Sequence, residues 1–197
     1  MEGIYKANIT AGALLVPESR KIADLLLRNV TSSEWKQAIE EKNILQKLSV
    51  SSSKRVAAHI RSRLELMTPE LWEMVKDGGA QTATHAVFAA AIKHCRILGD
   101  YLDLVVREQF RCLEDRLTPR LWEDFIEACN QRDPSMEDFP PSTAKKMRSV
   151  VHKILFEAGY IKNVYSWELQ KIAIDTDVLS YLERNHEQYV LKCIRVC

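Results

Sequence analysis

The sequence has little glycine and little proline, six residues of each among 197, which excludes a turn-rich β-sandwich or barrel and a low-complexity chain. It also lacks a long hydrophobic run. The longest weakly polar stretch, residues 80–92, is shorter than the roughly 20 residues needed to cross a bilayer. The net charge does not indicate a class of partner, because 28 Lys and Arg nearly balance 27 Asp and Glu. With no signal-like apolar run after Met1, we expect a cytoplasmic protein without a membrane span.

Catalytic and metal-binding patterns are also missing. The five cysteines are odd in number and form no CxxC pair, which predicts reduced thiols rather than a disulfide framework. Cysteine and histidine lack the paired short spacings of a zinc site, so we predict no metal. The GxGxxG and P-loop motifs of nucleotide binding, the HExxH motif of metalloproteases and the GxSxG motif of hydrolases do not occur. We therefore expect no catalytic residue, no cofactor and no enzymatic activity.

Apolar residues recur at three- and four-residue spacing through most of the chain, as in Val56, Ile60 and Leu64. This period predicts an all-α fold, a compact globular protein of many helices. The Ala-rich, acid-free stretch from Gly78 to Gly99 is expected to be buried. The best strand candidates form one short ribbon within 160–174. The expected helices are 18–29, 32–42, 52–66, 69–77, two within 80–114, 119–130, 143–158 and two short ones from about 176 onward.

Three of these helices begin in the same way, with an apolar residue, a threonine and a tryptophan four residues after the threonine. A threonine N-cap accepts a hydrogen bond from a free helix donor, while the residue before it packs on the fourth helical residue as a hydrophobic staple. The longer match between 68–73 and 118–123 is explained either by internal duplication or by two helices that merely start alike. The three pairs are Thr31 and Trp35, Thr68 and Trp72, and Thr118 and Trp122.

Positive charge gathers in two segments, 42–64 and 139–156, which contain no acidic residue. Each holds a helix that follows a shorter helix, and on both helices an apolar back opposes an outward face with basic residues at the N-terminal end. A recognition helix in a DNA major groove has this layout, because basic ends meet phosphates and small residues let the backbone approach. The candidate DNA-binding residues are Lys54, Arg55, His59, Arg61, Ser62, Arg63, Lys145, Lys146, Ser149 and Lys153.

The two segments predict two helix-turn-helix elements, and the second is winged if the 160–174 ribbon forms. They divide the chain into an N-terminal helix-turn-helix region (1–77), central helices (78–131) and a C-terminal, winged region (132–197), with three prolines in 132–141 marking the second boundary. A basic helix face is also typical of a plain solvated surface, and this alternative applies to either segment taken alone. Partly exposed, neutral side chains are expected for His59 and His152.

Six blocks of the sequence are distinctive: GALLVPESR (12–20), NILQKLS (43–49), IRSRL (60–64), IKHCRILGDY (92–101), STAKKM (142–147) and ILFEAGYI (154–161). In this order, and over nearly the whole chain, they resemble the BrxA family of BREX bacteriophage-exclusion systems. The resemblance implies a small all-helical protein of a bacterial phage-defence operon, with helix-turn-helix elements and the ability to bind double-stranded DNA. It also implies a DNA methyltransferase, large ATPases and a phosphatase-like protein as operon companions. It offers no catalytic motif to carry over.

Two functions of different classes follow. The first is a non-enzymatic subunit, monomeric because it has two recognition helices of its own, that binds double-stranded DNA. The second is a protein–protein adaptor whose helices dock other BREX components. RNA binding is a weaker third alternative, because the sequence offers no exposed aromatic pairs on which unpaired bases would stack.

Overall fold

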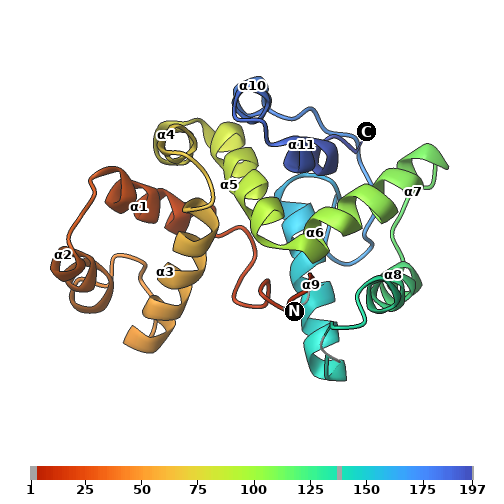
Figure 1. Ribbon diagram of the computed structural model, residues 1–197, viewed down its shortest axis with the longest axis horizontal. Helices are drawn as coiled ribbons and strands as arrows, with labels where there is room; N and C mark the ends of the chain where they lie inside the picture. Colours follow the sequence, from red (N-terminus) through yellow and green to blue (C-terminus); the bar gives the residue numbers. More distant parts are fainter. Residues whose placement is uncertain (1–3, 137–138, 197) are drawn as a thin grey trace.

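The computed structural model describes residues 4–136 and 139–196, and the fold over these residues is all-helical, as predicted (Figure 1). The helices within 80–114 are α5 (Ala80–His94) and an almost unbroken rod, in which the π-helical turn η2 (Leu102–Val106) joins α6 (Arg96–Tyr101) to α7 (Arg107–Arg111). The elements are α1 (Val16–Leu27), α2 (Ser32–Lys36), η1 (Gln37–Glu41), α3 (Val50–Leu64), α4 (Pro69–Asp77), α5 (Ala80–His94), α6 (Arg96–Tyr101), η2 (Leu102–Val106), α7 (Arg107–Arg111), α8 (Pro119–Arg132), α9 (Pro141–Glu157), α10 (Thr176–Arg184) and α11 (Gln188–Ile194).

The predicted threonine caps form at two of the three helix starts. The Thr31 Oγ1 accepts a hydrogen bond from the Glu34 amide at 3.3 Å, and the Glu34 carboxylate accepts one from the Thr31 amide at 2.8 Å, completing a capping box on α2. The Thr118 Oγ1 caps α8 through the Leu121 amide at 3.4 Å. Thr68 differs, because its hydroxyl donates instead to the phenol oxygen of Tyr181 at 3.1 Å.

The Ala-rich helix α5 lies in the middle of the molecule and contacts α1, α3, α4, α10 and α11. Residues 85–92 on it are buried, whereas residues 79–81 and Arg96 are exposed, so the burial expected for 78–99 is confirmed only in part of that stretch. Alanine suits such a position because its small side chain lets neighbouring helices approach closely. One cluster of buried apolar side chains includes members from all three regions expected from the sequence, and the division into those regions stays a prediction.

A small ladder of backbone pairing follows α9. Residues 160–162 pair with 168–170, through the Ile161–Leu169 bridge and a 2.8 Å hydrogen bond from the Lys162 amide to the Glu168 carbonyl. Residues 167–169 also pair, through their backbone, with residues 115–117, which lie just before α8. The short ribbon expected within 160–174 therefore forms, but its backbone pairing extends only to Gln170. The strand candidate 170–174 is wrong, because residues 171–174 make no β-bridge. We refer to residues 160–170 as the hairpin.

Among the described residues, no helix combines the length and the apolar character that crossing a membrane requires.

Candidate nucleic-acid interface

Helix α3 presents three exposed basic side chains, those of Lys54, Arg55 and Arg61. The Lys54 ammonium lies 3.1 Å from the Glu40 carboxylate, and Arg61 pairs with Glu65 at 2.7 Å. Both cations are solvent-exposed, so these pairs are weak and are screened by salt. Arg55 makes no ion pair within the described part of the chain. This face of α3 therefore has positive charge available to a ligand.

The outward placement of Arg63 is wrong. Its side chain is 1% exposed, and its guanidinium donates hydrogen bonds to the Ala13 carbonyl at 2.6 Å and to the Gly12 carbonyl at 3.2 Å. Position 63 follows Val56 by seven residues and Ile60 by three, so it belongs to the apolar stripe of α3. Burial lowers the pKa of the guanidinium to about 10, and its charge contacts protein carbonyls rather than solvent.

The expected partial exposure of His59 is also wrong. The ring is buried, with its edge against the His94 ring at a centroid distance of 5.7 Å. Burial and the neighbouring Arg63 charge lower the His59 pKa to about 3, so this ring supplies no cation to a phosphate at neutral pH. Ser62 is exposed as predicted, with its hydroxyl donating to the His59 carbonyl at 2.9 Å.

Helix α9 presents the second basic face, where Lys145, Lys146, Ser149 and Lys153 are all exposed. The Lys153 ammonium lies 3.8 Å from the Glu157 carboxylate at the end of the helix. The small Ser149 side chain lies on the same face, and its hydroxyl donates back to the Lys145 carbonyl at 3.0 Å. Within the described residues, Lys145 and Lys146 have no acidic partner.

His152 also differs from its expected partial exposure. It is buried, and its ring stacks on that of Trp167 at 4.0 Å and 11°. Burial lowers its pKa to about 4, which keeps the ring neutral at pH 7. Arg148, which was not among the candidate residues, lies 3.4 Å from the Glu123 carboxylate and over the Trp167 ring at 5.8 Å. Arg148 and His152 thus hold the hairpin against α9.

The N-terminal segment links the two basic helices. The Ala13 carbonyl accepts a hydrogen bond from Arg63 on α3, and the next amide, that of Leu14, donates to the Glu157 carboxylate on α9 at 2.8 Å. In Figure 1 both helices project toward the bottom of the view, with their N-terminal ends lowest. The N-terminal ends of the two basic helices therefore lie on the same side of the molecule in this view.

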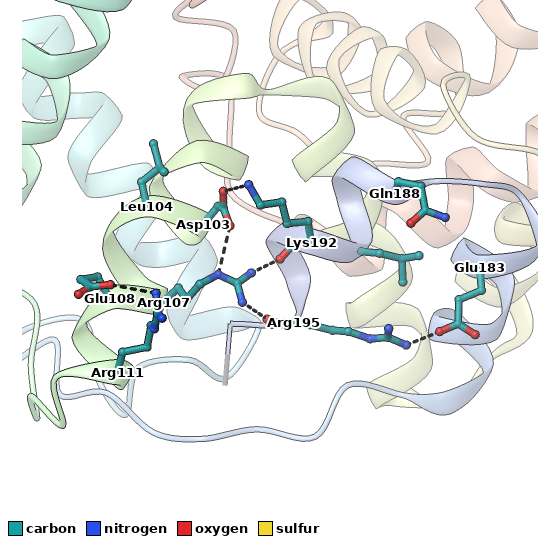
Figure 2. A pocket seen from close by; sticks show the side chains of 10 residues that line it. Asp103, Leu104, Arg107, Glu108, Arg111, Glu183, Gln188, Lys192 and Arg195 are labelled. Carbon is teal, nitrogen blue, oxygen red and sulfur yellow. Dashed lines mark hydrogen bonds and ion pairs between the residues drawn. The ribbon is translucent and has the colours of Figure 1, made fainter.

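A charged hollow of about 750 Å³ lies elsewhere, between η2–α7 and α10–α11 (Figure 2). The Asp103 carboxylate accepts from Arg107 at 3.1 Å and pairs with Lys192 at 2.6 Å. Arg107 also donates to the carbonyls of Lys192 and Arg195, at the end of α11, while the Arg195 side chain pairs with Glu183 at 2.5 Å. These charges bind one another, and the contacts attach α11 to η2.

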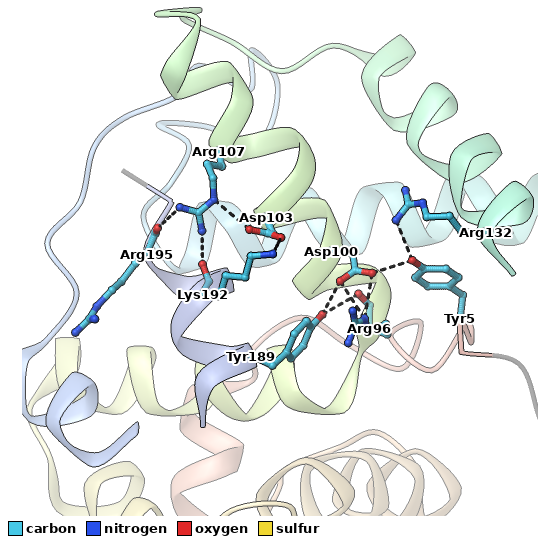
Figure 3. A network of polar contacts seen from close by, with 9 residues as sticks. All are labelled: Tyr5, Arg96, Asp100, Asp103, Arg107, Arg132, Tyr189, Lys192 and Arg195. Atoms are coloured by element: carbon cyan, nitrogen blue, oxygen red, sulfur yellow. Dashed lines mark hydrogen bonds and ion pairs between the residues drawn. The ribbon is translucent and has the colours of Figure 1, made fainter. Parts of the chain in front are cut away.

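A buried carboxylate, Asp100, organises a second polar network beside the hollow (Figure 3). It accepts hydrogen bonds from the hydroxyls of Tyr5 at 2.8 Å and Tyr189 at 3.0 Å and from Arg96 at 3.0 Å, and Arg132 donates to the Tyr5 hydroxyl at 3.1 Å. Burial, followed by the Asp100 hydrogen bond, raises the Tyr5 pKa. The network joins the N-terminal segment, α6, α8 and α11. Across the described residues, no three His, Cys, Asp or Glu side chains are grouped to hold a metal ion.

Comparisons with known proteins agree with one another. The family model described as BrxA matches residues 3–186. The chain is similar to "BREX protein BrxA" of Paramagnetospirillum magneticum, at 50% identity over 98% of this chain and 96% of the relative. It is also similar to the "BREX protein BrxA" of Escherichia coli O9:H4 (strain HS), at 28% identity over 95% of this chain and 88% of the relative.

Among solved structures, the fold resembles the crystal structure of an uncharacterized protein from Magnetospirillum magneticum. The TM-score is 0.92 and the sequence identity 49%, with 98% of this chain and 99% of that chain covered. The family match extends over far more than half of the sequence, and the structural match includes both basic helices and the hairpin. The chain therefore belongs to the BrxA family of BREX proteins.

Proposed function

We propose that this chain is a non-enzymatic, cytoplasmic component of a BREX phage-defence system that binds double-stranded DNA as a monomer through α3 and α9. One observation carries the proposal. Two helices of like layout present exposed basic residues near their N-terminal ends, and both ends lie on one side of the molecule. Lysine and arginine neutralise phosphates, and the N-terminal end of a helix adds a favourable dipole toward an anion.

The order of elements around α9 supports the same proposal. A short paired segment at 115–117 precedes α8 and α9, and the hairpin follows α9 and pairs back on 115–117. A strand, two helices and a returning hairpin occur in this order in a winged helix-turn-helix, in which the second helix lies in the major groove. By this comparison α9 is the recognition helix and the hairpin is its wing.

Fluorescence anisotropy on a labelled duplex, over a series of salt concentrations, tests the proposal. We expect affinity to fall steeply as salt rises, because binding releases counterions from the phosphates, and we expect single-stranded RNA of equal length to bind more weakly. No duplex binding at low salt, or tighter binding to the RNA, would contradict the proposal. Sedimentation of the same complex checks that one copy of the chain binds a short duplex.

A second candidate function is an adaptor that docks other BREX proteins, for which the expected companions are a methyltransferase, ATPases and a phosphatase-like protein. The hollow beside η2 favours it, because Glu183 and the exposed end of Lys192 line it with charges of both signs and the half-exposed Leu104 lines it with apolar surface. Co-purification of operon proteins by a chain that binds neither DNA nor RNA would favour this function over the first.

A further inference from the structure

The tip of the hairpin presents an aromatic ring to solvent. The Tyr165 side chain is 93% exposed, and the neighbouring Val164 is also exposed. An exposed apolar residue is ordinary when it stands alone on a loose loop. This tyrosine differs because its backbone is fixed, and because it belongs to an element that packs directly on a basic helix.

Side-chain hydrogen bonds hold the tip in one conformation. The Asn163 Oδ1 accepts from the amides of Tyr165 at 2.9 Å and Ser166 at 2.8 Å. The Trp167 indole donates to the Val164 carbonyl at 2.8 Å. These contacts order the backbone of the turn and leave the Tyr165 ring free to meet a ligand, so little backbone entropy is lost on binding.

The base of the hairpin is attached to α9. Trp167 stacks on His152 of that helix at 4.0 Å, and the Arg148 guanidinium lies 5.8 Å from the centre of the Trp167 ring. Backbone pairing with 115–117 holds the other side. The position of the hairpin beside α9 is therefore set by the fold.

We propose that Tyr165 enters the DNA minor groove next to the major-groove segment occupied by α9, with its ring against the sugars and base edges. This inference rests on the proposed function. The minor groove is about 6 Å wide, which admits a flat ring edge-on, and inserted apolar side chains are a common device of minor-groove binding. The tip suits the approach of phosphates, because residues 162–167 contain no acidic residue and Lys162 pairs with the nearby Glu168.

The chemistry of the contact gives it a distinct signature. A ring that packs on sugars and base edges neutralises no phosphate, so its loss weakens binding without changing the dependence on salt. Loss of a lysine that meets a phosphate changes both. The two kinds of contact can therefore be separated in one set of titrations.

The experiment measures duplex affinity at several salt concentrations for the parent and for Tyr165→Ala, Tyr165→Phe and the double variant Lys145→Ala/Lys146→Ala. We expect Tyr165→Ala to bind about fivefold to tenfold more weakly with an unchanged salt slope, and Tyr165→Phe to bind like the parent. Leu113→Ala is the matched control, because that side chain is 85% exposed and lies outside the hairpin and both basic helices. It should leave affinity unchanged.

A second arm uses netropsin, which fills the minor groove of A·T-rich duplexes. It should weaken the parent and leave the affinity of Tyr165→Ala nearly unchanged. If Tyr165→Ala binds like the parent while the double lysine variant binds weakly, the minor-groove contact is wrong and the proposed function stands. If Tyr165→Ala changes the salt slope, or netropsin weakens both proteins equally, the contact is also wrong. If the parent does not bind duplex DNA, the proposed function and this inference fail together.

Discussion

Arg55 and Arg63 belong to the same helix but have opposite surroundings. Arg55 is exposed with no ion-pair partner among the described residues, whereas the Arg63 guanidinium is buried on two backbone carbonyls. A buried guanidinium is expensive to desolvate, so its hydrogen bonds must be retained in the folded state. We therefore expect separate tasks for the two arginines, the proposed DNA contact for Arg55 and stability for Arg63.

Replacing each arginine by alanine separates these tasks. Arg63→Ala should lower the free energy of unfolding by about 2–4 kcal/mol, because it leaves the carbonyls of Gly12 and Ala13 unpaired and opens a cavity. Arg55→Ala should leave stability within about 0.5 kcal/mol of the parent. Urea unfolding followed by circular dichroism measures both. Equal stability of the two variants would contradict the buried role of Arg63.

The sequence alone predicts only part of this difference between the exposed Arg55 and the buried Arg63. The helical period places position 63 on the apolar stripe of α3, but a basic side chain was assigned to the surface because unpaired charges are rarely buried. Its partners, the carbonyls of Gly12 and Ala13, belong to an irregular segment about fifty positions earlier in the chain. No local pattern predicts a contact of that range. The exposed residues Lys54, Lys145 and Lys146 depended only on their own helices, and their exposure was predicted correctly.

At the scale of elements, the start of α8 combines a threonine cap with a buried tryptophan. Trp122 is 2% exposed, and its ring lies 5.2 Å from that of Tyr101 in the α6 rod and 5.9 Å from that of Phe125. Thr118 caps the same helix. The cap satisfies one backbone donor, whereas the tryptophan fills core volume between two helices. The two contributions therefore differ in size.

Trp122→Ala should cost about 3–5 kcal/mol of stability and Thr118→Ala about 1 kcal/mol. Lys145→Ala, on the exposed face of α9, is the control and should leave the melting temperature unchanged. Differential scanning calorimetry of the three variants gives the comparison. The assignment of Trp122 to the core fails if its variant melts together with that of Lys145.

Helix positions were predictable because the apolar period is local. The expected helices 52–66, 119–130 and 143–158 match α3, α8 and α9 within two residues at each end. The π-helical turns η1 and η2 were not predictable, since each is a single short turn that continues an α-helix directly. Pairing of 115–117 with the hairpin was missed as well, because a strand this short is identified only by its partner.

For the molecule as a whole, the main feature is the fixed relation between α3 and α9. Adjacent residues of the N-terminal segment, Ala13 and Leu14, bond to Arg63 of α3 and to Glu157 of α9. Two weak binding sites held at a constant separation act together, because engagement of one raises the effective concentration of the other. This fixed relation is the basis of the proposal that one chain binds DNA through two grooves without a second copy.

Binding through both helices would make the affinity for DNA depend steeply on salt. The exposed basic residues of the two helices are Lys54, Arg55, Arg61, Lys145, Lys146 and Lys153. If all of them meet phosphates, the slope of log affinity against log salt is about −5, and removal of two cations makes it shallower by about 2. A control variant, Arg28→Ala/Arg111→Ala, removes two exposed cations from other elements and should leave the slope unchanged.

The most direct test compares the salt slopes of two double variants, Lys54→Ala/Arg55→Ala on α3 and Lys145→Ala/Lys146→Ala on α9, on one duplex. The account predicts that each variant loses most of the parent's affinity and has a shallower slope, because both helices contact phosphates at once. If either variant binds like the parent with the parent's slope, its helix does not touch DNA. Binding through both helices of a single chain would then be wrong.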